Sequence, residues 1–174
     1  MGSERQEKIK LLSRSSKGKD LLPGYLLSLS DAVGSRIARE MLTGLQERDL
    51  LEAHFRRGYS ESKASGRVFS TTYSLDGRSA VIRTVTCFAD WLDEIVFLLL
   101  KESEYCGAVR MHGRDLLRHC AEILVLDGDS VRILSEDHSQ GFLLDVTADD
   151  PEFYFELTLW GNAWADAMLK CSER

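Results

Sequence analysis

The stretch from residue 108 to residue 160 restricts the fold most, because strand patterns follow one another there with only short turns between them. The clearest pattern is residues 153–160, where apolar side chains at odd positions alternate with mostly polar ones at even positions, as in a strand with one buried face. Residues 114–120 are ambiguous and fit a short helix. Further strands are expected at residues 108–111, 123–126, 131–134 and 142–146, with a hairpin at Gly128 joining the second and third of these.

A β-hairpin is the clearest local prediction upstream of this stretch. Residues 69–75 alternate in polarity, Asp76-Gly77 favours a type I′ turn, and residues 81–85 alternate again as the return strand. Thr86 is then placed to cap a helix, since acidic residues follow it and Lys101 comes at the far end. The buried stripe of that helix is predicted to contain Trp91, Ile95, Leu98 and Leu99.

Both ends of the chain carry helical patterns. Residues 3–14 show a weak one, followed by a polar break at residues 15–20 and a turn at Pro23-Gly24. A helix is predicted from Ser30 or Asp31, and a pattern over residues 50–55 continues it or forms a separate helix that ends at residues 56–58. At the other end, residues 163–170 form the last predicted helix. The helix from Ser30 is predicted to bury Val33, Ile37, Met41 and Leu45.

Runs of strands joined by short turns, without regular alternation of strand and helix, predict an α+β fold. We expect a mainly antiparallel sheet of about 5–7 strands, flanked by an N-terminal helical region, one central helix and a C-terminal helix. A chain of 174 residues with 44% hydrophobic and 29% charged residues is typical of one globular domain. Within a single domain of residues 1–174 we expect a helical part at 1–58, a linker at 59–66 and a mixed part at 67–174.

The longest uninterrupted apolar run, residues 95–100, is too short for a membrane span or a signal-peptide core, so a cytoplasmic protein is expected. The four cysteines include no close pair, which favours reduced thiols over a disulfide scaffold. Residues 1–59 carry 11 Lys and Arg against 8 Asp and Glu, a net charge of +3, whereas residues 60–174 carry 11 against 20, a net charge of −9. This acidity disfavours nucleic-acid binding and suits a basic protein partner.

Templates for catalysis and for cofactors fail along the whole chain. Residues 16–20 lack the upstream glycine of a phosphate-binding loop, residues 58–62 do not complete a serine-hydrolase elbow, and residues 127–130 do not continue as a calcium loop. No cofactor is expected. Cys87 is the thiol of most interest, because it lies at the start of the predicted helix after Thr86. The residues that could bind zinc are Cys106, His112, His119 and Cys120. They lack the two close ligand pairs that structural zinc sites usually have.

The remaining candidate is an acidic rim, formed by turns at one end of the sheet and flanked by aromatic side chains. Steering charge combined with aromatic side chains is typical of protein recognition. The predicted partner-binding residues are Asp127, Asp129, Glu136, Asp137, Asp149, Asp150, Tyr154 and Trp160.

The leading hypothesis is therefore an acidic inhibitor or immunity-type protein that neutralises a basic partner such as a toxin enzyme. One alternative is a secretion chaperone for an effector protein, with homodimerisation in its favour. The other is a small enzyme that uses His112 or His119 together with Cys87 or an Asp.

Overall fold

The chain folds around a single antiparallel sheet whose strand order is β1-β6-β5-β4-β2-β3. A computed structural model describes residues 2–128, 130–149 and 152–172, and the sheet has six strands within them. The elements are α1 (Gly2–Ala32), η1 (Arg39–Met41), α2 (Leu45–Ser65), β1 (Val68–Ser74), η2 (Leu75–Gly77), α3 (Arg78–Ala89), β2 (Ile95–Leu98), α4 (Ser103–Cys106), β3 (Val109–His112), α5 (Gly113–Arg118), α6 (Cys120–Leu126), β4 (Ser130–Ser135), β5 (Gly141–Asp149), β6 (Glu152–Trp160) and α7 (Asn162–Ser172).

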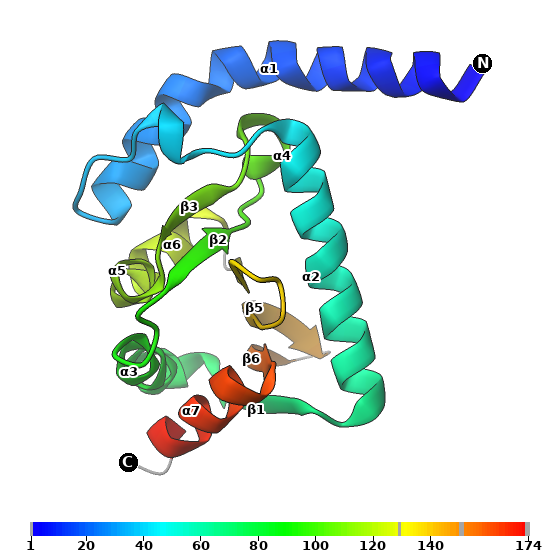
Figure 1. Cartoon of the computed structure of the whole chain (residues 1–174). Coiled ribbons are helices and arrows are strands. Elements are labelled where there is room, and N and C mark those ends of the chain that lie inside the picture. The colour runs from blue at the N-terminus through cyan, green and yellow to red at the C-terminus, as the bar shows by residue number, and fades with distance from the viewer. Residues whose placement is uncertain (1, 129, 150–151, 173–174) are drawn as a thin grey trace.

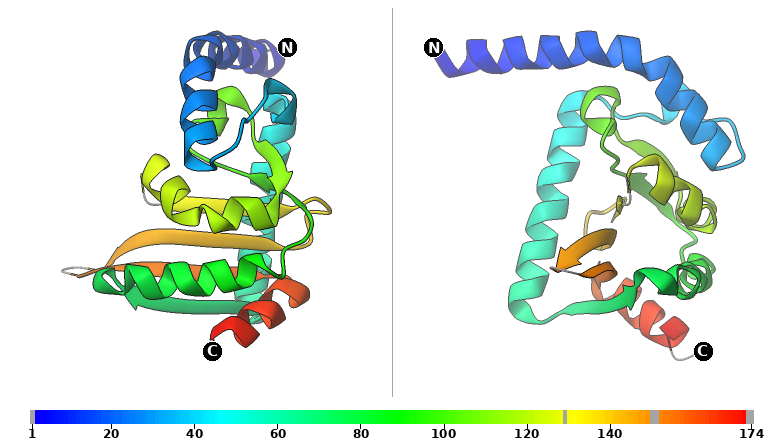
Figure 2. Two further views of the ribbon diagram at one scale, coloured as in Figure 1. Left: turned by 90° about the vertical axis from the view of Figure 1, so that its left-hand side faces the viewer. Right: turned by 180° about the vertical axis from the view of Figure 1, so that it is seen from behind.

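Helices cover the two faces of the sheet unequally (Figure 1). On one face, α3, α5, α6 and α7 pack over the larger hydrophobic core, which the second half of α1 also enters through Tyr25 and Leu29. On the other face, α2 crosses the strands at one end, so the far end of that face has no helix over it (Figure 2). The smaller core beneath α2 consists of Leu51, Phe55, Phe97, Leu99, Ala108, Leu134 and Trp160.

The α+β class and the antiparallel sheet agree with the sequence prediction. Strands predicted at residues 108–111, 131–134, 142–146 and 153–160 correspond to β3, β4, β5 and β6, and the last predicted helix corresponds to α7. The expected alternation of β6 is present in part: Phe155, Leu157 and Leu159 are buried in the larger core, but Phe153 is exposed, and Thr158 and Trp160 on the other face are buried as well. The ambiguous stretch at residues 114–120 contains α5, a short helix.

The predicted hairpin after β1 is wrong, and so is the helix expected to follow it. The segment after Asp76-Gly77 is helix α3, because Val81, Val85 and Phe88 lie at helical spacing and are all buried. That helix ends at Ala89, and the apolar run that follows is the buried strand β2. Residues 123–126 are likewise helical in α6, so the hairpin predicted at Gly128 does not form.

The helical N-terminal part also differs from its prediction. Helix α1 continues through the polar break at residues 15–20 and through Pro23, after which Figure 1 shows it running in a new direction, as a helix does at a proline kink. It ends at Ala32, followed by Gly34 in the left-handed conformation, so no helix begins at Ser30. The segment 59–66 is no linker, since α2 continues to Ser65 and ends at Gly66.

Contacts along α1 explain why its polar stretch is helical. Arg14 binds the carboxylate of Asp49 at 2.7 Å and donates to the backbone oxygen of Glu104. Gly18 lies against the backbone of Tyr105 so closely that a Cβ would come within 2.1 Å of the carbonyl oxygen. None of the helices in the described part of the chain has the length and apolar character needed to span a bilayer.

Candidate functional site: the open face of the sheet

The structure divides the predicted acidic rim between two opposite ends of the sheet. Asp127 and the start of β4 lie at the end where β5 finishes and β6 begins, and Tyr154 lies near this end as well. Glu136 and Asp137 lie in the β4–β5 turn at the other end, separated from Asp127 by the length of β4, roughly 20 Å. Asp149 is the last residue of β5, whereas Asp129 and Asp150 lie outside the described residues.

The residues at the β4–β5 end are engaged within the protein. Glu136 forms an ion pair with Arg110 of β3. Asp137 accepts hydrogen bonds from the Ser135 hydroxyl at 2.7 Å and from the backbone N–H of Ser139 at 3.0 Å, and these bonds lower the pKa of its carboxyl. This arrangement is a side-chain-stabilised turn. Trp160 is only 2% exposed, so it belongs to the core and not to a contact surface.

Asp127 lies at the opposite end and is partly desolvated. Its carboxylate accepts a hydrogen bond from the backbone N–H of Lys101 at 2.5 Å, which ties the end of α6 to the segment after β2. Burial nevertheless raises the pKa of Asp127 from 3.8 to about 6. Asp127 therefore carries a charge that the fold stabilises poorly at neutral pH.

The uncovered part of the α2 side of the sheet provides a different candidate surface. Its side chains come from β1, β4, β5 and β6, and every one of them is exposed or half-buried. Figure 2 shows these strands extending past α2, toward the end of β5 and the start of β6, with no helix over this side. We name this surface the open face and define it by Thr72, Ser74, Ser130, Arg132, Asp145, Thr147, Tyr154 and Glu156.

Two carboxylates face each other at the centre of the open face. Asp145 of β5 and Glu156 of β6 are directly paired across the two strands, a position in which like charges destabilise a sheet. Desolvation raises the pKa of Asp145, and the charge of Glu156 acts in the same direction. Glu156 accepts a hydrogen bond from the Thr158 hydroxyl at 3.3 Å. The fold thus holds two acidic groups side by side on a surface without a covering helix.

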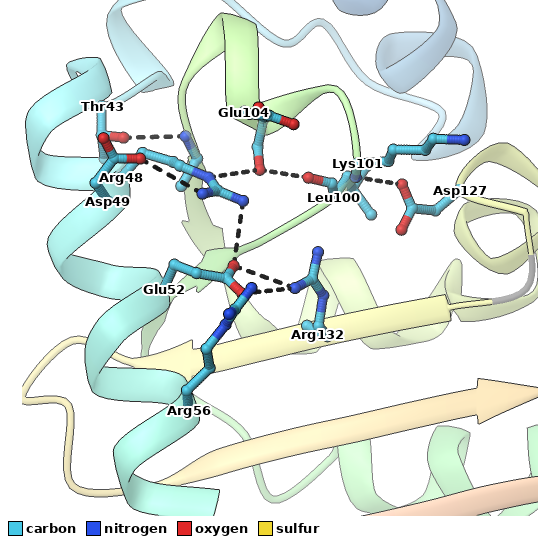
Figure 3. Close-up of polar contacts among 12 residues, drawn as sticks. Thr43, Arg48, Asp49, Glu52, Arg56, Leu100, Lys101, Glu104, Asp127 and Arg132 are labelled. Carbon is cyan, nitrogen blue, oxygen red and sulfur yellow. Dashed lines mark hydrogen bonds and ion pairs between the residues drawn. The ribbon is translucent and has the colours of Figure 1, made fainter. Parts of the chain in front are cut away.

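An arginine network borders the open face where α2 crosses the sheet (Figure 3). Its centre is Glu52 of α2, whose side chain is 10% exposed and accepts hydrogen bonds from three arginines. Arg48 and Arg56 come from the turns of α2 before and after Glu52, at 3.1 and 2.8 Å, and Arg132 reaches it from β4 at 3.0 Å. Asp49, the partner of Arg14, also lies 3.5 Å from Arg48.

This network fixes α2 on the sheet and takes up the positive charge of Arg132. Arg132 contributes to the open face, but its guanidinium is bound to both oxygens of Glu52 at 3.0 and 3.1 Å. Arg48 connects the network further to the hydroxyl of Ser103 at 3.4 Å. Within the described residues neither carboxylate of the Asp145 and Glu156 pair forms an ion pair as short as those of Glu52, but a hydrogen bond from Ser130 and the charge of Arg132 lower the pKa of Asp145, and the charge of Glu156 raises the pKa of Lys63 on α2.

The structure does not assemble the thiol and histidine candidates for catalysis. Cys87 of α3 lines a cavity together with Arg83, Thr84 and Cys171, and no histidine of the described chain lines that cavity. Burial raises the pKa of Cys120 to about 12, which keeps that thiol protonated and unreactive. No group of three or more His, Cys, Asp or Glu side chains in the described ranges is placed to hold a metal ion, so Cys106, His112, His119 and Cys120 do not form a zinc site there.

Sequence reasoning did not select the Asp145 and Glu156 pair. The alternation of residues 142–146 and 153–160 places both side chains on the polar faces of their strands. The missing information was the register, because shifting one strand by a single residue would move its whole set of side chains to the other face. A scan against protein-family models found no match for this chain, and searches of curated proteins and of solved structures found no match either.

Proposed function

We propose that this protein is a protein-binding domain that uses the open face to bind a basic partner, as an inhibitor or immunity protein binds a toxin enzyme. The observation that carries the proposal is the pairing of Asp145 and Glu156 on a surface that no helix covers. Arg132 and Lys63 offset the repulsion between them only in part, since desolvation still raises the pKa of Asp145, and a cationic side chain placed between the two carboxylates would offset it further.

The distribution of charge along the chain supports the same class of partner. Residues 60–174, which contribute all six strands of the sheet, carry a net charge of −9. Such an excess attracts a basic protein from a distance and raises the rate of association. The open face also offers hydroxyl groups beside the carboxylates, from Thr72, Tyr154 and Ser130, which suit hydrogen bonding to a polar partner surface.

The test is affinity capture from a lysate of the source organism with three versions of the full chain. They are the wild type, Asp145→Asn/Glu156→Gln, and the charge-matched control Glu47→Gln/Glu61→Gln, which alters exposed carboxylates on α2. The two open-face substitutions remove the charge and keep one acceptor oxygen in each side chain. Bound proteins are identified by mass spectrometry at low and at high salt.

We expect the wild type and the control to retain a basic protein at low salt and to release it at high salt. The open-face variant should capture at least tenfold less of that protein. Capture of the same protein by all three versions, or capture of no protein, would contradict the proposal. If the captured partner is a full-length folded enzyme, direct inhibition of its activity by the purified chain then completes the test.

A further inference from the structure

The edge strand β1 has a free side. The sheet order places β1 at one end, where β6 is its only neighbour in the sheet. In an antiparallel pair the N–H and C=O groups of alternate residues point away from the neighbouring strand. Across the described chain, no backbone hydrogen bond joins residues 68–74 to any segment other than β6. A row of backbone donors and acceptors is therefore available along β1.

The other edge of the sheet is protected and β1 is not. Strand β3 has only four residues and is bridged on its outer side by Leu42. Strand β1 has seven residues, Val-Phe-Ser-Thr-Thr-Tyr-Ser, with no charged residue and no proline among them. Natural edge strands usually carry such a residue, or a bulge or a cover, to prevent pairing with another chain. Helix α7 lies beside the start of β1, because Asp166 and Leu169 line a pocket with Phe69 and Ser70, but the strand carries no charge or proline that would prevent pairing.

The sequence of β1 is complementary to itself when it runs antiparallel about Thr71. Phe69 then faces Tyr73 of the second copy, Ser70 faces the second copy's Thr72, and Thr71 faces its own equivalent. Aromatic pairs and hydroxyl pairs are the cross-strand combinations that stabilise a sheet. Phe69 and Tyr73 both pack on the helix-covered side, so two such aromatic pairs would extend the larger core across the symmetry axis.

The charges that flank β1 fit the same register. Arg67 precedes the strand and Asp76 follows it, and both side chains are exposed. In the register centred on Thr71, Arg67 of one copy is opposite Leu75 of the other, and Asp76 follows one residue later in η2, so an arginine and an aspartate approach each other at each end of the paired strands. A chain with a net charge of −6 repels its own copies in general, so an uncharged strand between two opposite charges is a favourable place for two copies to meet.

We propose that two copies of this chain associate through their β1 strands, in antiparallel register about Thr71, to form one continuous sheet across a two-fold axis. The occupant of the edge is a second copy because the side-chain pairs and the flanking charges both match this strand to itself. A symmetric interface of this kind is the commonest way for identical chains to form a closed dimer. The proposal does not depend on the partner of the open face.

The test uses the full chain with lysines on the exposed positions of β1. Ser70→Lys/Thr72→Lys places lysines opposite each other twice in the paired strands, while both side chains are exposed in the single chain. The control is Gln46→Lys/Ser60→Lys, which adds the same charge at exposed positions of α2. A third version, Ser70→Glu/Thr72→Glu, has the opposite charge. Circular dichroism establishes that each version is folded.

Sedimentation equilibrium gives the mass of each version. We expect the wild type and the control at twice the chain mass of 19.6 kDa, and the lysine and glutamate versions each at the mass of one chain. An equimolar mixture of the lysine and glutamate versions should return to the mass of two chains, because each lysine then faces a glutamate. A monomeric wild type, a dimeric lysine version, or a mixture that stays monomeric would overturn the proposal. Binding of a different protein at β1 would leave the purified wild type monomeric and so counts against it.

Discussion

Gly141 and Trp160 are paired across β5 and β6, and the indole ring of Trp160 lies directly against the Cα of Gly141. A Cβ at position 141 would come within 2.0 Å of a ring atom. The other side of the indole packs edge-on against Phe55 and Tyr59 of α2, with ring centroids 4.7 and 5.8 Å away. The absence of a side chain at Gly141 therefore allows Trp160 to join α2 to the sheet.

Gly141→Ala should destabilise the protein by about 1 to 3 kcal/mol, because the added methyl group forces the indole out of its packed position. Urea unfolding followed by tryptophan fluorescence measures the change. Gly24→Ala is the matched control, since the space around Gly24 in α1 is open and alanine there favours the helix. Equal midpoints for Gly141→Ala and the wild type would show that the contact is not tight in solution.

Removal of Glu52 should be more damaging than removal of any exposed carboxylate of α2. Glu52→Ala leaves Arg48, which is 11% exposed, and Arg132 without their shared partner. Breaking a buried ion pair in this way costs about 3 to 5 kcal/mol. Glu61→Ala, at an exposed position of the same helix, should change the free energy of unfolding by less than about 0.5 kcal/mol. Similar urea midpoints for the two variants would contradict the role given to the network.

Asp127 makes stability depend on pH in a direction opposite to that of an ordinary paired carboxylate. Its pKa is about 6 in the folded chain against an ordinary value of 3.8, so the folded state binds the proton more tightly than the unfolded state does. The tighter binding of this proton stabilises the folded state below pH 4, and this stabilisation is lost as the pH rises through 6. Asp127→Asn, which keeps an acceptor for the Lys101 N–H, should gain stability relative to the wild type between pH 4 and pH 7. Thermal unfolding at both pH values measures this, and a constant difference would contradict the shift.

His54 of α2 should be harder to protonate than a free histidine. Its ring lies 4.6 Å from the ring of His138, and Arg57 donates a hydrogen bond to Nδ1 at 2.8 Å, which requires that nitrogen to be unprotonated. Desolvation, with His138 and Arg57 adding to it, lowers the pKa of His54. An NMR titration should therefore give a pKa below 6.5 for His54 and a higher value in His138→Asn. A pKa that His138→Asn leaves unchanged would show that the two rings do not interact in solution.

The sequence predicted correctly those strands whose apolar side chains fit the two-residue period of a strand and not the period of a helix. In residues 153–160 the apolar side chains occur at every second position, and the strand is present as β6. Val81 and Val85 fit a strand and a helix equally well, because four positions separate them. Phe88, seven positions after Val81, completes the buried stripe of α3 and decides in favour of the helix.

The candidate site required knowledge of distant contacts. The acidic residues were identifiable by their neighbours in the sequence, but Glu136 and Asp137 lie at the opposite end of β4 from Asp127, which follows only once residues 130–135 are known to be one strand. The helical state of residues 15–20 depends on Arg14 reaching Asp49 and Glu104, and the sequence alone gives no measure of that contact. Asp145 and Glu156 become a pair only when the register of β5 and β6 is known.

The most direct measurement for the open face is NMR mapping with a defined basic probe, a lysine-rich peptide added to the isotope-labelled full chain at low salt. Amide shifts should concentrate at residues 70–74, 130–132, 143–147 and 154–158, weaken as salt rises, and disappear in Asp145→Asn/Glu156→Gln. Shifts of equal size spread over α1, α2 and the β4–β5 turn, or shifts that survive in that variant, would contradict the claim that the open face recognises a basic partner.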